Sequence, residues 1–177
     1  MVQSLDEKRL SLICLRWLGF NALAVVAYLP FGWYESGYGF SALPLFVVAA
    51  QAYYLRRDCP WWIWAPVSFF GCASSLLFLM FWGLAFGCTM SLAQAACLAP
   101  RSVRAALAWA ILGALGWIVA AAIFFGSDLG AHSWAIHWSI AFGTQSFFFL
   151  PAVIMLDKAA LARASKQSNE SPSGSGV

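Results

Sequence analysis

Long apolar stretches separated by short polar ones set the pattern of this chain. The stretch from Cys59 to Pro100 is the longest of them and contains no Asp, Glu, Lys or Arg. As a single straight helix it would be about 63 Å long, roughly twice the thickness of the hydrocarbon core of a bilayer. Two crossings joined by a tight turn near Phe81-Trp82-Gly83 therefore fit better, with Gly83 or Gly87 allowing the chain to reverse.

Four further apolar stretches come close to the length of about 20 residues that a helix needs to cross a bilayer. They lie at residues 14–31, 40–55, 105–125 and 134–156. With the two crossings expected within residues 61–98, they predict an all-α integral membrane protein with six transmembrane helices in three consecutive hairpins. We expect the six-helix membrane domain at residues 13–157 and its hairpins at about residues 13–57, 60–100 and 104–157.

Both chain ends are expected in the cytoplasm. Residues 1–12 form a cytoplasmic N-terminal segment, and the long apolar run after it indicates a retained first helix rather than a cleavable signal peptide. Residues 158–177 form a cytoplasmic tail. The sequence DKAALARASK is able to continue the last helix beyond the membrane, whereas the Ser-, Pro- and Gly-rich end is expected to be disordered.

The basic residues test this topology independently, because Lys and Arg collect in cytoplasmic loops. In the six-helix arrangement all ten Lys and Arg residues fall on one side of the membrane. The loops on the opposite side contain only Glu35 and Asp128 as charged residues. A single crossing between Cys59 and Pro100 would instead carry Arg101 and Arg104 to the outer side, so the charges favour two crossings.

The composition excludes a soluble domain. The chain is 62% hydrophobic and 10% charged, whereas an average soluble domain is about half apolar and about a quarter charged. The lipid bilayer is the expected surrounding, with membrane-protein partners or a homo-oligomer as further contacts and no nucleic acid. Without a eukaryotic targeting signal, a bacterial plasma membrane is the favoured location and a thylakoid membrane the alternative.

The three hairpins carry signs of an internal repeat. Gly19 and Gln51 in the first hairpin correspond without gaps to Gly113 and Gln145 in the third. In the middle hairpin, Gly71 and Gln94 take these places after a deletion in the outer turn. Each hairpin is thus expected to have a glycine early in its first helix and a glutamine deep in its second.

Packing within the bundle is predicted from its small and proline residues. Gly113 and Trp117, four positions apart, are candidates for a small–large interlock, since small residues let membrane helices approach closely. Pro44 and Pro151 are the candidates for helix kinks, because proline removes a backbone donor.

The glutamines are the main candidates for ligand binding, because a buried amide must find hydrogen-bond partners in a membrane. One interpretation is that they join helices to one another. The other is a ligand site, since polar groups within a membrane often mark a ligand path. The candidate ligand-binding residues, with aromatic walls and one histidine, are Gln51, Gln94, Gln145, Trp117, Trp138 and His137.

The polar residues expected at the outer face are Glu35, Asp128 and His132. They are either solvated loop residues or the point of entry for a cation or proton. His132 and His137 are the only histidines, and on a helix their side chains would point about 140° apart, which prevents them from sharing one metal ion. No metal site and no cofactor are therefore expected, and haem in particular lacks axial ligands.

The five cysteines, at positions 14, 59, 72, 88 and 97, form no CxxC pair. Buried free thiols are the favoured interpretation, and a redox pair or metal site is the alternative. The chain has no GxSxG, HExxH or P-loop motif and no paired intramembrane carboxylates, so we do not expect an enzyme.

Two classes of function remain. The first is a membrane-embedded binding or transport component for a small, weakly polar molecule, without a motor of its own. The alternative is a structural or assembly subunit of a larger membrane complex. Convergence of the three glutamines on an enclosed cavity would favour the first class, and a solid bundle would favour the second.

Overall fold

A computed structural model of the chain describes residues 2–32, 43–74, 82–126 and 134–170. Every regular element in these ranges is an α-helix, which confirms the all-α class. The helices are α1 (Val2–Gly32), α2 (Leu43–Tyr54), α3 (Trp61–Ser74), α4 (Trp82–Leu98), α5 (Val103–Gly126) and α6 (Trp134–Glu170).

Three of these helices are long and apolar enough to cross a membrane. The qualifying segments are Glu7–Tyr28 in α1, Val103–Ile123 in α5 and Ser139–Ser168 in α6. The other three helices have 12, 14 and 17 described residues and fall short of the length of about 20 that a crossing needs. Association with a membrane follows from the three long helices.

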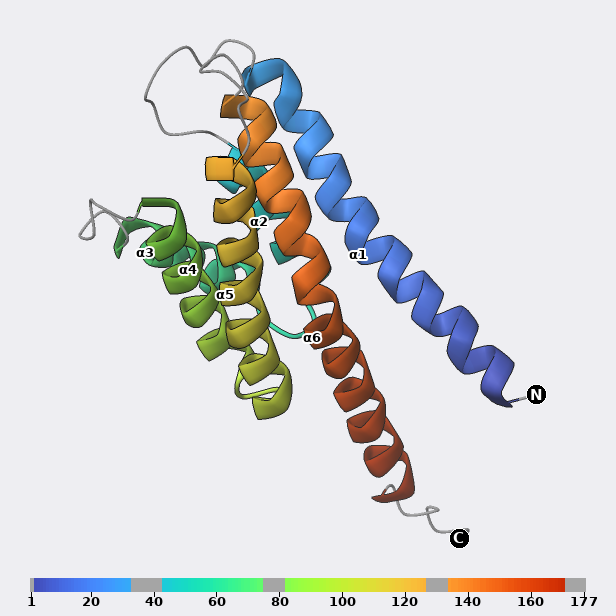
Figure 1. Ribbon diagram of the computed structural model, residues 1–177. Coiled ribbons are helices and arrows are strands. Elements are labelled where there is room, and N and C mark those ends of the chain that lie inside the picture. The colour runs from blue at the N-terminus through green and yellow to red at the C-terminus, as the bar shows by residue number, and fades with distance from the viewer. Residues whose placement is uncertain (1, 33–42, 75–81, 127–133, 171–177) are drawn as a thin grey trace, which may run out of the picture.

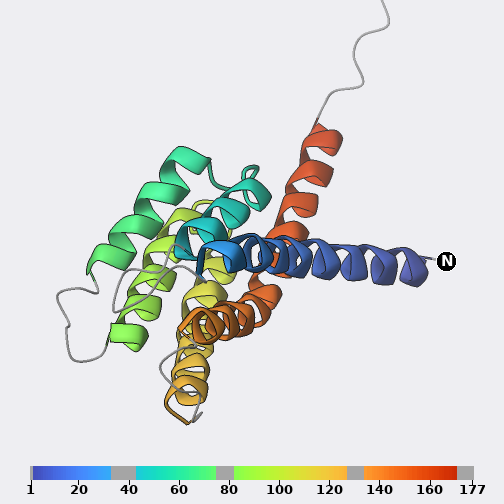
Figure 2. The same ribbon diagram turned by 90° about the horizontal axis from the view of Figure 1, so that it is seen from above.

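The six helices pack in a closed ring. Each helix contacts its neighbours in the sequence, and α1 also contacts α6, which closes the circle. Figures 1 and 2 show α1 and α6 lying along one side of the bundle and α3, α4 and α5 along the other. The pairs α1/α2, α3/α4 and α5/α6 are therefore adjacent in space as well as in sequence.

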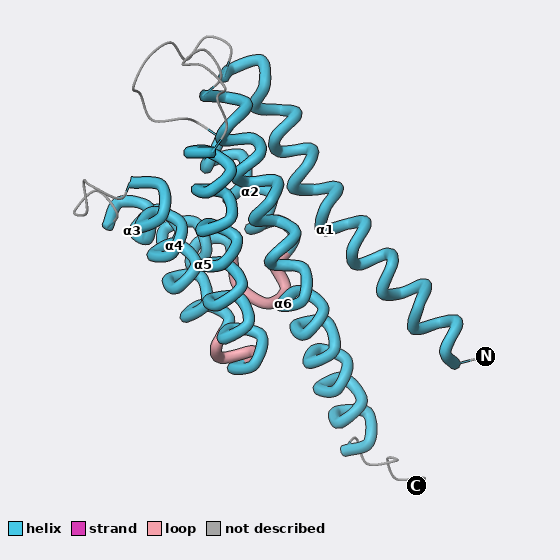
Figure 3. The backbone as a smooth tube through the Cα atoms, in the orientation of Figure 1, coloured by secondary structure: helices cyan, strands magenta, loops and turns pink. Residues whose placement is uncertain are grey.

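The charged residues gather toward one end of the bundle. The beginning of α1 and the end of α6 project from the same end in Figure 1, and Figure 3 shows both described loops on the side facing it. The Arg9 guanidinium pairs with the Asp157 carboxylate at 2.9 Å. Arg163 lies 3.8 Å from the Asp58 carboxylate, and the Nε of Arg101 donates to the Asp58 carbonyl at 3.1 Å. These contacts join α1, both loops and α6.

Local signals explain where the helices around these loops begin. The Ser102 hydroxyl accepts a hydrogen bond from the backbone N–H of Ala105 at 3.2 Å, so Ser102 caps the N-terminus of α5. The carbonyl of Pro60 accepts the first hydrogen bonds of α3, from Ile63 and Trp64. Proline directly before a helix loses nothing by lacking an N–H, because the first N–H groups of a helix have no partner within it.

Several predicted helix boundaries are wrong. α1 begins at Val2 rather than near Cys14, so most of the predicted N-terminal segment is helical. The continuation of the last helix is confirmed and runs to Glu170. Trp82 and Gly83 open α4, so the expected turn is not at these two residues. Pro44 is the second residue of α2, where it costs no helical hydrogen bond, whereas Pro151 lies inside α6.

Candidate functional site

Each of the six helices contributes a buried tryptophan or glutamine, and the two residue types alternate along the order of the helices. The odd-numbered helices α1, α3 and α5 contribute Trp17, Trp64 and Trp109, and the even-numbered helices α2, α4 and α6 contribute Gln51, Gln94 and Gln145. All six side chains are at most 1% exposed. We refer to these six residues as the tryptophan–glutamine core.

Trp109 is the centre of the aromatic contacts. Its ring stacks on Phe149 with centroids 3.9 Å apart and meets the rings of Trp64 and Trp17 edge-on at 5.5 and 5.7 Å. The two edge-on contacts are favourable because the positive edge of one ring meets the negative face of another. The Trp109 indole of α5 therefore contacts aromatic rings on α1, α3 and α6.

Gln94 is the centre of the polar contacts. Its Nε2 donates to the Ser68 hydroxyl at 2.9 Å and to the Gln51 Oε1 at 3.5 Å. Its Oε1 accepts from the Trp109 Nε1 at 3.1 Å. One amide therefore links α2, α3, α4 and α5, and the Gln51 Nε2 extends the network to the Asn21 Oδ1 on α1 at 3.4 Å.

Gln145 makes its hydrogen bond to a serine and to neither of the other two glutamines. Its Nε2 donates to the Ser91 hydroxyl on α4 at 3.5 Å, and its Oε1 has no hydrogen-bond partner in the described part of the chain. The neighbouring carbonyl of Ser146 accepts from the Trp17 Nε1 at 2.8 Å. All three glutamines are buried and bonded to another helix, as the interpretation of glutamines as links between helices requires.

The N–H groups of Trp109 and Trp17 each bond to another helix, but the third bond that a threefold repeat would require is not present in the described residues. Trp109 of the third hairpin donates to Gln94 of the second, and Trp17 of the first donates to the residue after Gln145 of the third. The matching bond would run from Trp64 of the second hairpin to the vicinity of Gln51 in the first. The Trp64 Nε1 is buried, and no partner for it lies within the described ranges.

Among the other predicted site residues, Trp117 is the one with a described side chain, and it does not join this core. Trp117 is buried in a second apolar cluster, where its ring meets Phe142 edge-on at 5.2 Å. Trp138 and His137 lie on α6, but their side chains are outside the described part of the structure. Glu35, Asp128 and His132 also lie outside the described residues, so their predicted outer-face role stays a prediction.

The predicted interlock of Gly113 with Trp117 is replaced by two separate contacts between helices. The Trp117 ring on α5 covers Gly87 on α4, where an added Cβ would overlap the indole. Gly113 faces Ser91 and Phe149. Gly19, which corresponds to Gly113 in the proposed repeat, has nothing within 4 Å of an added Cβ. The repeat therefore does not extend to the packing around these two glycines.

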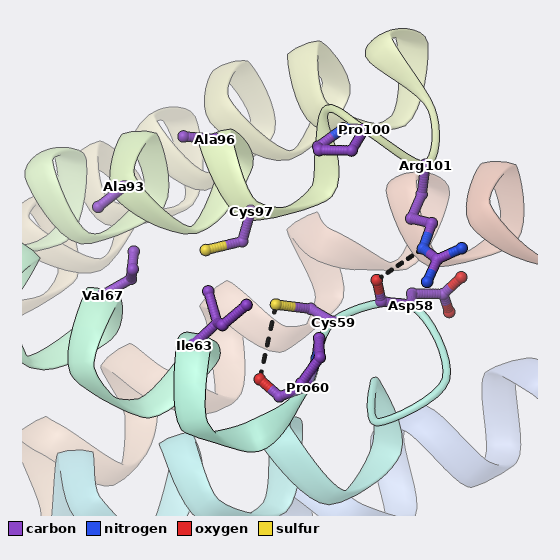
Figure 4. Close-up of a pocket in the computed structure, with 10 residues that line it drawn as sticks. All are labelled: Asp58, Cys59, Pro60, Ile63, Val67, Ala93, Ala96, Cys97, Pro100 and Arg101. Atoms are coloured by element: carbon purple, nitrogen blue, oxygen red, sulfur yellow. Dashed lines mark hydrogen bonds between the residues drawn. The ribbon is translucent and has the colours of Figure 1, made fainter.

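A groove lies between α3 and α4 in the described part of the chain. Its volume is about 620 Å³, within the range of about 300–1,000 Å³ typical of small-molecule sites. The α3–α4 groove is lined by Asp58, Cys59, Pro60, Ile63, Val67, Ala93, Ala96, Cys97, Pro100 and Arg101 (Figure 4). None of the three glutamines lines it.

The groove is apolar along its length and charged at one end. Ile63 and Val67 of α3 face Ala93 and Ala96 of α4, and Arg101 stands at the end near the loops (Figure 4). Only the Nε of the Arg101 guanidinium makes a side-chain hydrogen bond within the described ranges, and Figure 4 shows the guanidinium beside Asp58 at the edge of the groove. A guanidinium with available N–H groups binds a carboxylate or phosphate well.

Asp58 and Cys59 stand at the same end, outside the membrane-spanning helices. Burial raises the pKa of the Asp58 carboxyl, and the nearby guanidinium groups of Arg163 and Arg101 oppose this rise. Burial also raises the pKa of the Cys59 thiol to about 12, with the neighbouring Cys97 as the next cause. The Cys59 thiol therefore keeps its proton at neutral pH.

The sequence alone did not point to the groove. Its charged end is formed by two loops, Asp58-Cys59-Pro60 and Pro100-Arg101, that are about 40 residues apart. A charged residue within two positions of a proline in each loop is the one shared signal, and it indicates two loop ends on one side of the membrane rather than a site. Within the described residues, no group of three or more His, Cys, Asp or Glu side chains is placed to hold a metal ion.

In comparisons with protein-family models, curated proteins and solved structures, the chain has no match. Arguments about its function therefore rest on the geometry of the tryptophan–glutamine core and of the α3–α4 groove.

Proposed function

We propose that this protein is a multi-pass membrane protein that binds a small amphipathic molecule in the α3–α4 groove, as a binding or transport component without a motor of its own. The molecule has an apolar body and an acidic polar group. The observation that carries the proposal is the combination of an apolar groove of about 620 Å³ with a guanidinium at one end.

The proposal includes six membrane crossings, with both termini on the cytoplasmic side of a bacterial plasma membrane. Its support is the gathering of Arg9, Asp58, Arg101, Asp157 and Arg163 into mutual contacts near one end of the bundle. Charges are costly inside a bilayer, so a charged end indicates one membrane surface. The three shorter helices adjoin further apolar sequence, such as Leu76 to Phe81 after α3, which supplies length for their crossings.

The side chains facing the groove support an amphipathic ligand. Ile63 is 43% exposed, and Trp61, Trp62, Phe69 and Phe70 are exposed on the same helix, so α3 presents an apolar face to its surroundings. A molecule dissolved in the bilayer would reach the groove from the side. Its acidic group would meet Arg101 at the level where the helices end, as expected at a membrane interface.

In this proposal the tryptophan–glutamine core supports the site instead of binding the ligand. Gln94 and Ser68 hydrogen-bond α4 to α3 at 2.9 Å on the buried side of these helices. Val67 and Ala93, which directly precede Ser68 and Gln94 in sequence, line the groove. The core hydrogen bond thereby fixes the spacing of the two groove walls.

Filling the groove tests the proposal. The protein is purified in mild detergent, and native mass spectrometry identifies small molecules retained by it. We expect Ala96→Phe to abolish retention by occupying the groove, and Arg101→Gln to reduce it more than Arg101→Lys, which keeps the charge. Ala122→Phe, at an exposed alanine of α5 outside the groove, is the matched control. Retention of the same molecule by Ala96→Phe would contradict the proposal.

A second candidate is a structural or assembly subunit of a larger membrane complex. The exposed aromatic face of α3 favours it, because Trp61, Trp62, Phe69 and Phe70 are each more than half exposed. Aromatic residues are enriched where membrane or protein partners bind. Stoichiometric protein partners in the mild-detergent preparation, lost on replacing Phe69 and Phe70 by leucine, would favour this candidate over ligand binding.

A further inference from the structure

Two cysteines of the α3–α4 groove come together from separate segments. Cys59 lies in the loop before α3, and Cys97 lies near the end of α4. Figure 4 shows both sulfur atoms in the space between these helices, and both side chains line the groove. The remaining described cysteines, Cys14 and Cys88, do not line the groove.

Hydrogen bonds hold the backbone on which the two cysteines lie. The Cys59 N–H donates to the Leu55 carbonyl at 2.8 Å, and the following proline starts α3. The next loop is tied to this one by the bond from Arg101 Nε to the Asp58 carbonyl. Cys97 lies on the helix that leads into Arg101. A dithiol held in this way loses little conformational freedom when an ion joins the sulfur atoms.

The donor set selects the type of ion. The Asp58 carboxylate points away from the sulfur atoms (Figure 4) and pairs with Arg163. No third metal-binding side chain joins the pair within the described ranges. Structural zinc sites use four ligands, and iron–sulfur clusters are held by cysteines that this groove does not supply. Soft thiolates with only two donors suit a d10 monovalent ion such as Cu(I), which accepts two-coordinate binding.

The charges around the groove agree with a monovalent ion. Binding replaces two S–H bonds by two metal–sulfur bonds and releases two protons to solvent, with no change of oxidation state. The product, one monovalent cation with two thiolates, has one negative charge. The Arg101 guanidinium lines the same groove and supplies one positive charge. The Asp58 charge is already offset by Arg163.

We propose that Cys59 and Cys97 form a two-thiolate site for a soft monovalent metal ion of the Cu(I) class. The inference goes beyond the proposed function and requires no amphipathic ligand. A metal ion at this site would cross-link the loop before α3 to the end of α4.

Competition for Cu(I) tests the site. The detergent-purified, fully reduced protein is titrated without oxygen against the coloured Cu(I) complex of bicinchoninate. We expect the wild-type chain to withdraw one Cu(I). Cys97→Ser and Cys59→Ser should weaken retention by more than about 100-fold, since even loss of an outer-shell partner costs about 10- to 100-fold. Cys14→Ser and Cys88→Ser are matched single-thiol controls and should retain Cu(I) as the wild type does.

Thermal unfolding of other variants provides a second test, which remains valid if Cys59→Ser folds poorly. An ion that binds only the native state raises the Tm, and the rise grows with the free ion concentration relative to its Kd. We expect Cu(I) to raise the Tm of the wild type and of Cys14→Ser and to leave that of Cys97→Ala unchanged. The inference is overturned if Cu(I) leaves the wild-type Tm unchanged. Undiminished retention by the Cys59→Ser/Cys97→Ser variant would also overturn it.

Discussion

Gln94 is a single polar side chain that hydrogen-bonds several helices to one another inside an apolar bundle. It is fully buried and uses both ends of its amide, donating to Gln51 and Ser68 and accepting from Trp109. Where water is scarce, an unpaired polar group is costly, so such a side chain is tolerated only if its partners are in place. Its hydrogen bonds therefore define which helices must meet.

Replacing Gln94 should destabilise the bundle more than replacing Gln145. Gln94→Leu leaves the Trp109 N–H and the Ser68 hydroxyl without their amide partner, and we expect the free energy of unfolding to fall by about 1–3 kcal/mol. Gln145→Leu removes a single 3.5 Å bond and should cost less. Reversible unfolding in mixed micelles provides the measurement. Equal losses in the two variants would contradict the central role of Gln94.

At this scale the sequence predicted the character of the buried residues better than their partners. Gln51, Gln94 and Gln145 lie within apolar runs of the sequence, where an amide must find its hydrogen-bond partners inside the bundle. Their burial therefore follows from the sequence. That Trp17, Trp64 and Trp109 meet at the centre could not be predicted. Tryptophan is equally at home in a core, at a membrane interface or facing lipid, and only the helix rotations decide among these.

The close approach of α4 and α5 depends on glycine, which has no side chain. The Trp117 ring rests on Gly87, and Gly113 takes up the Ser91 and Phe149 side chains in the same way. Glycine at such a crossing lets the helix backbones come together, since a Cβ would occupy the space of the opposing ring.

Gly87→Ala should therefore separate α4 from α5. Overpacking of this kind costs about 1–3 kcal/mol, and we expect the Tm in detergent to fall accordingly. Gly19→Ala in α1 is the matched control, because nothing lies within 4 Å of its added Cβ. It should leave the Tm unchanged or raise it through the better helix propensity of alanine. A Tm loss in Gly19→Ala as large as that in Gly87→Ala would contradict this assignment.

The helix boundaries show what hydropathy can and cannot detect. Apolar length placed the starts of α3 and α6 at Trp61 and Trp134, where the structure has them. It failed at the polar beginning of α1, because charge excludes a segment from lipid but not from a helix, whereas the helical continuation at the polar end of α6 was predicted. Leu, Glu, Lys, Arg and Ala are all good helix formers, and they dominate residues 5–12 and 157–166.

At the scale of the whole molecule, the six helices form a ring. Consecutive helices pack against each other, as short connections favour, and the contact of α1 with α6 closes the circle. Charge counting predicts which loops share a side, but it contains no information on which nonconsecutive helices meet. The α3–α4 groove, which depends on the spacing of two helices and on the loops beside it, was unpredictable for the same reason.

The central claim is that lipid surrounds most of the chain and that its charged end faces a single aqueous compartment. Cysteine labelling in intact bacterial cells tests it most directly. Single cysteines are introduced by Val103→Cys and Ser168→Cys at the charged end, and by Ser36→Cys and Ser127→Cys in the two predicted outer loops. The background has its five native cysteines replaced by alanine and must keep its Tm.

A membrane-impermeant maleimide is then added before and after permeabilisation. The account predicts immediate labelling at positions 36 and 127, and labelling at positions 103 and 168 only once the membrane is opened. Reaction at position 103 or 168 in sealed cells would mean that the charged end does not lie in the cytoplasm, and the six-crossing arrangement would have to be abandoned.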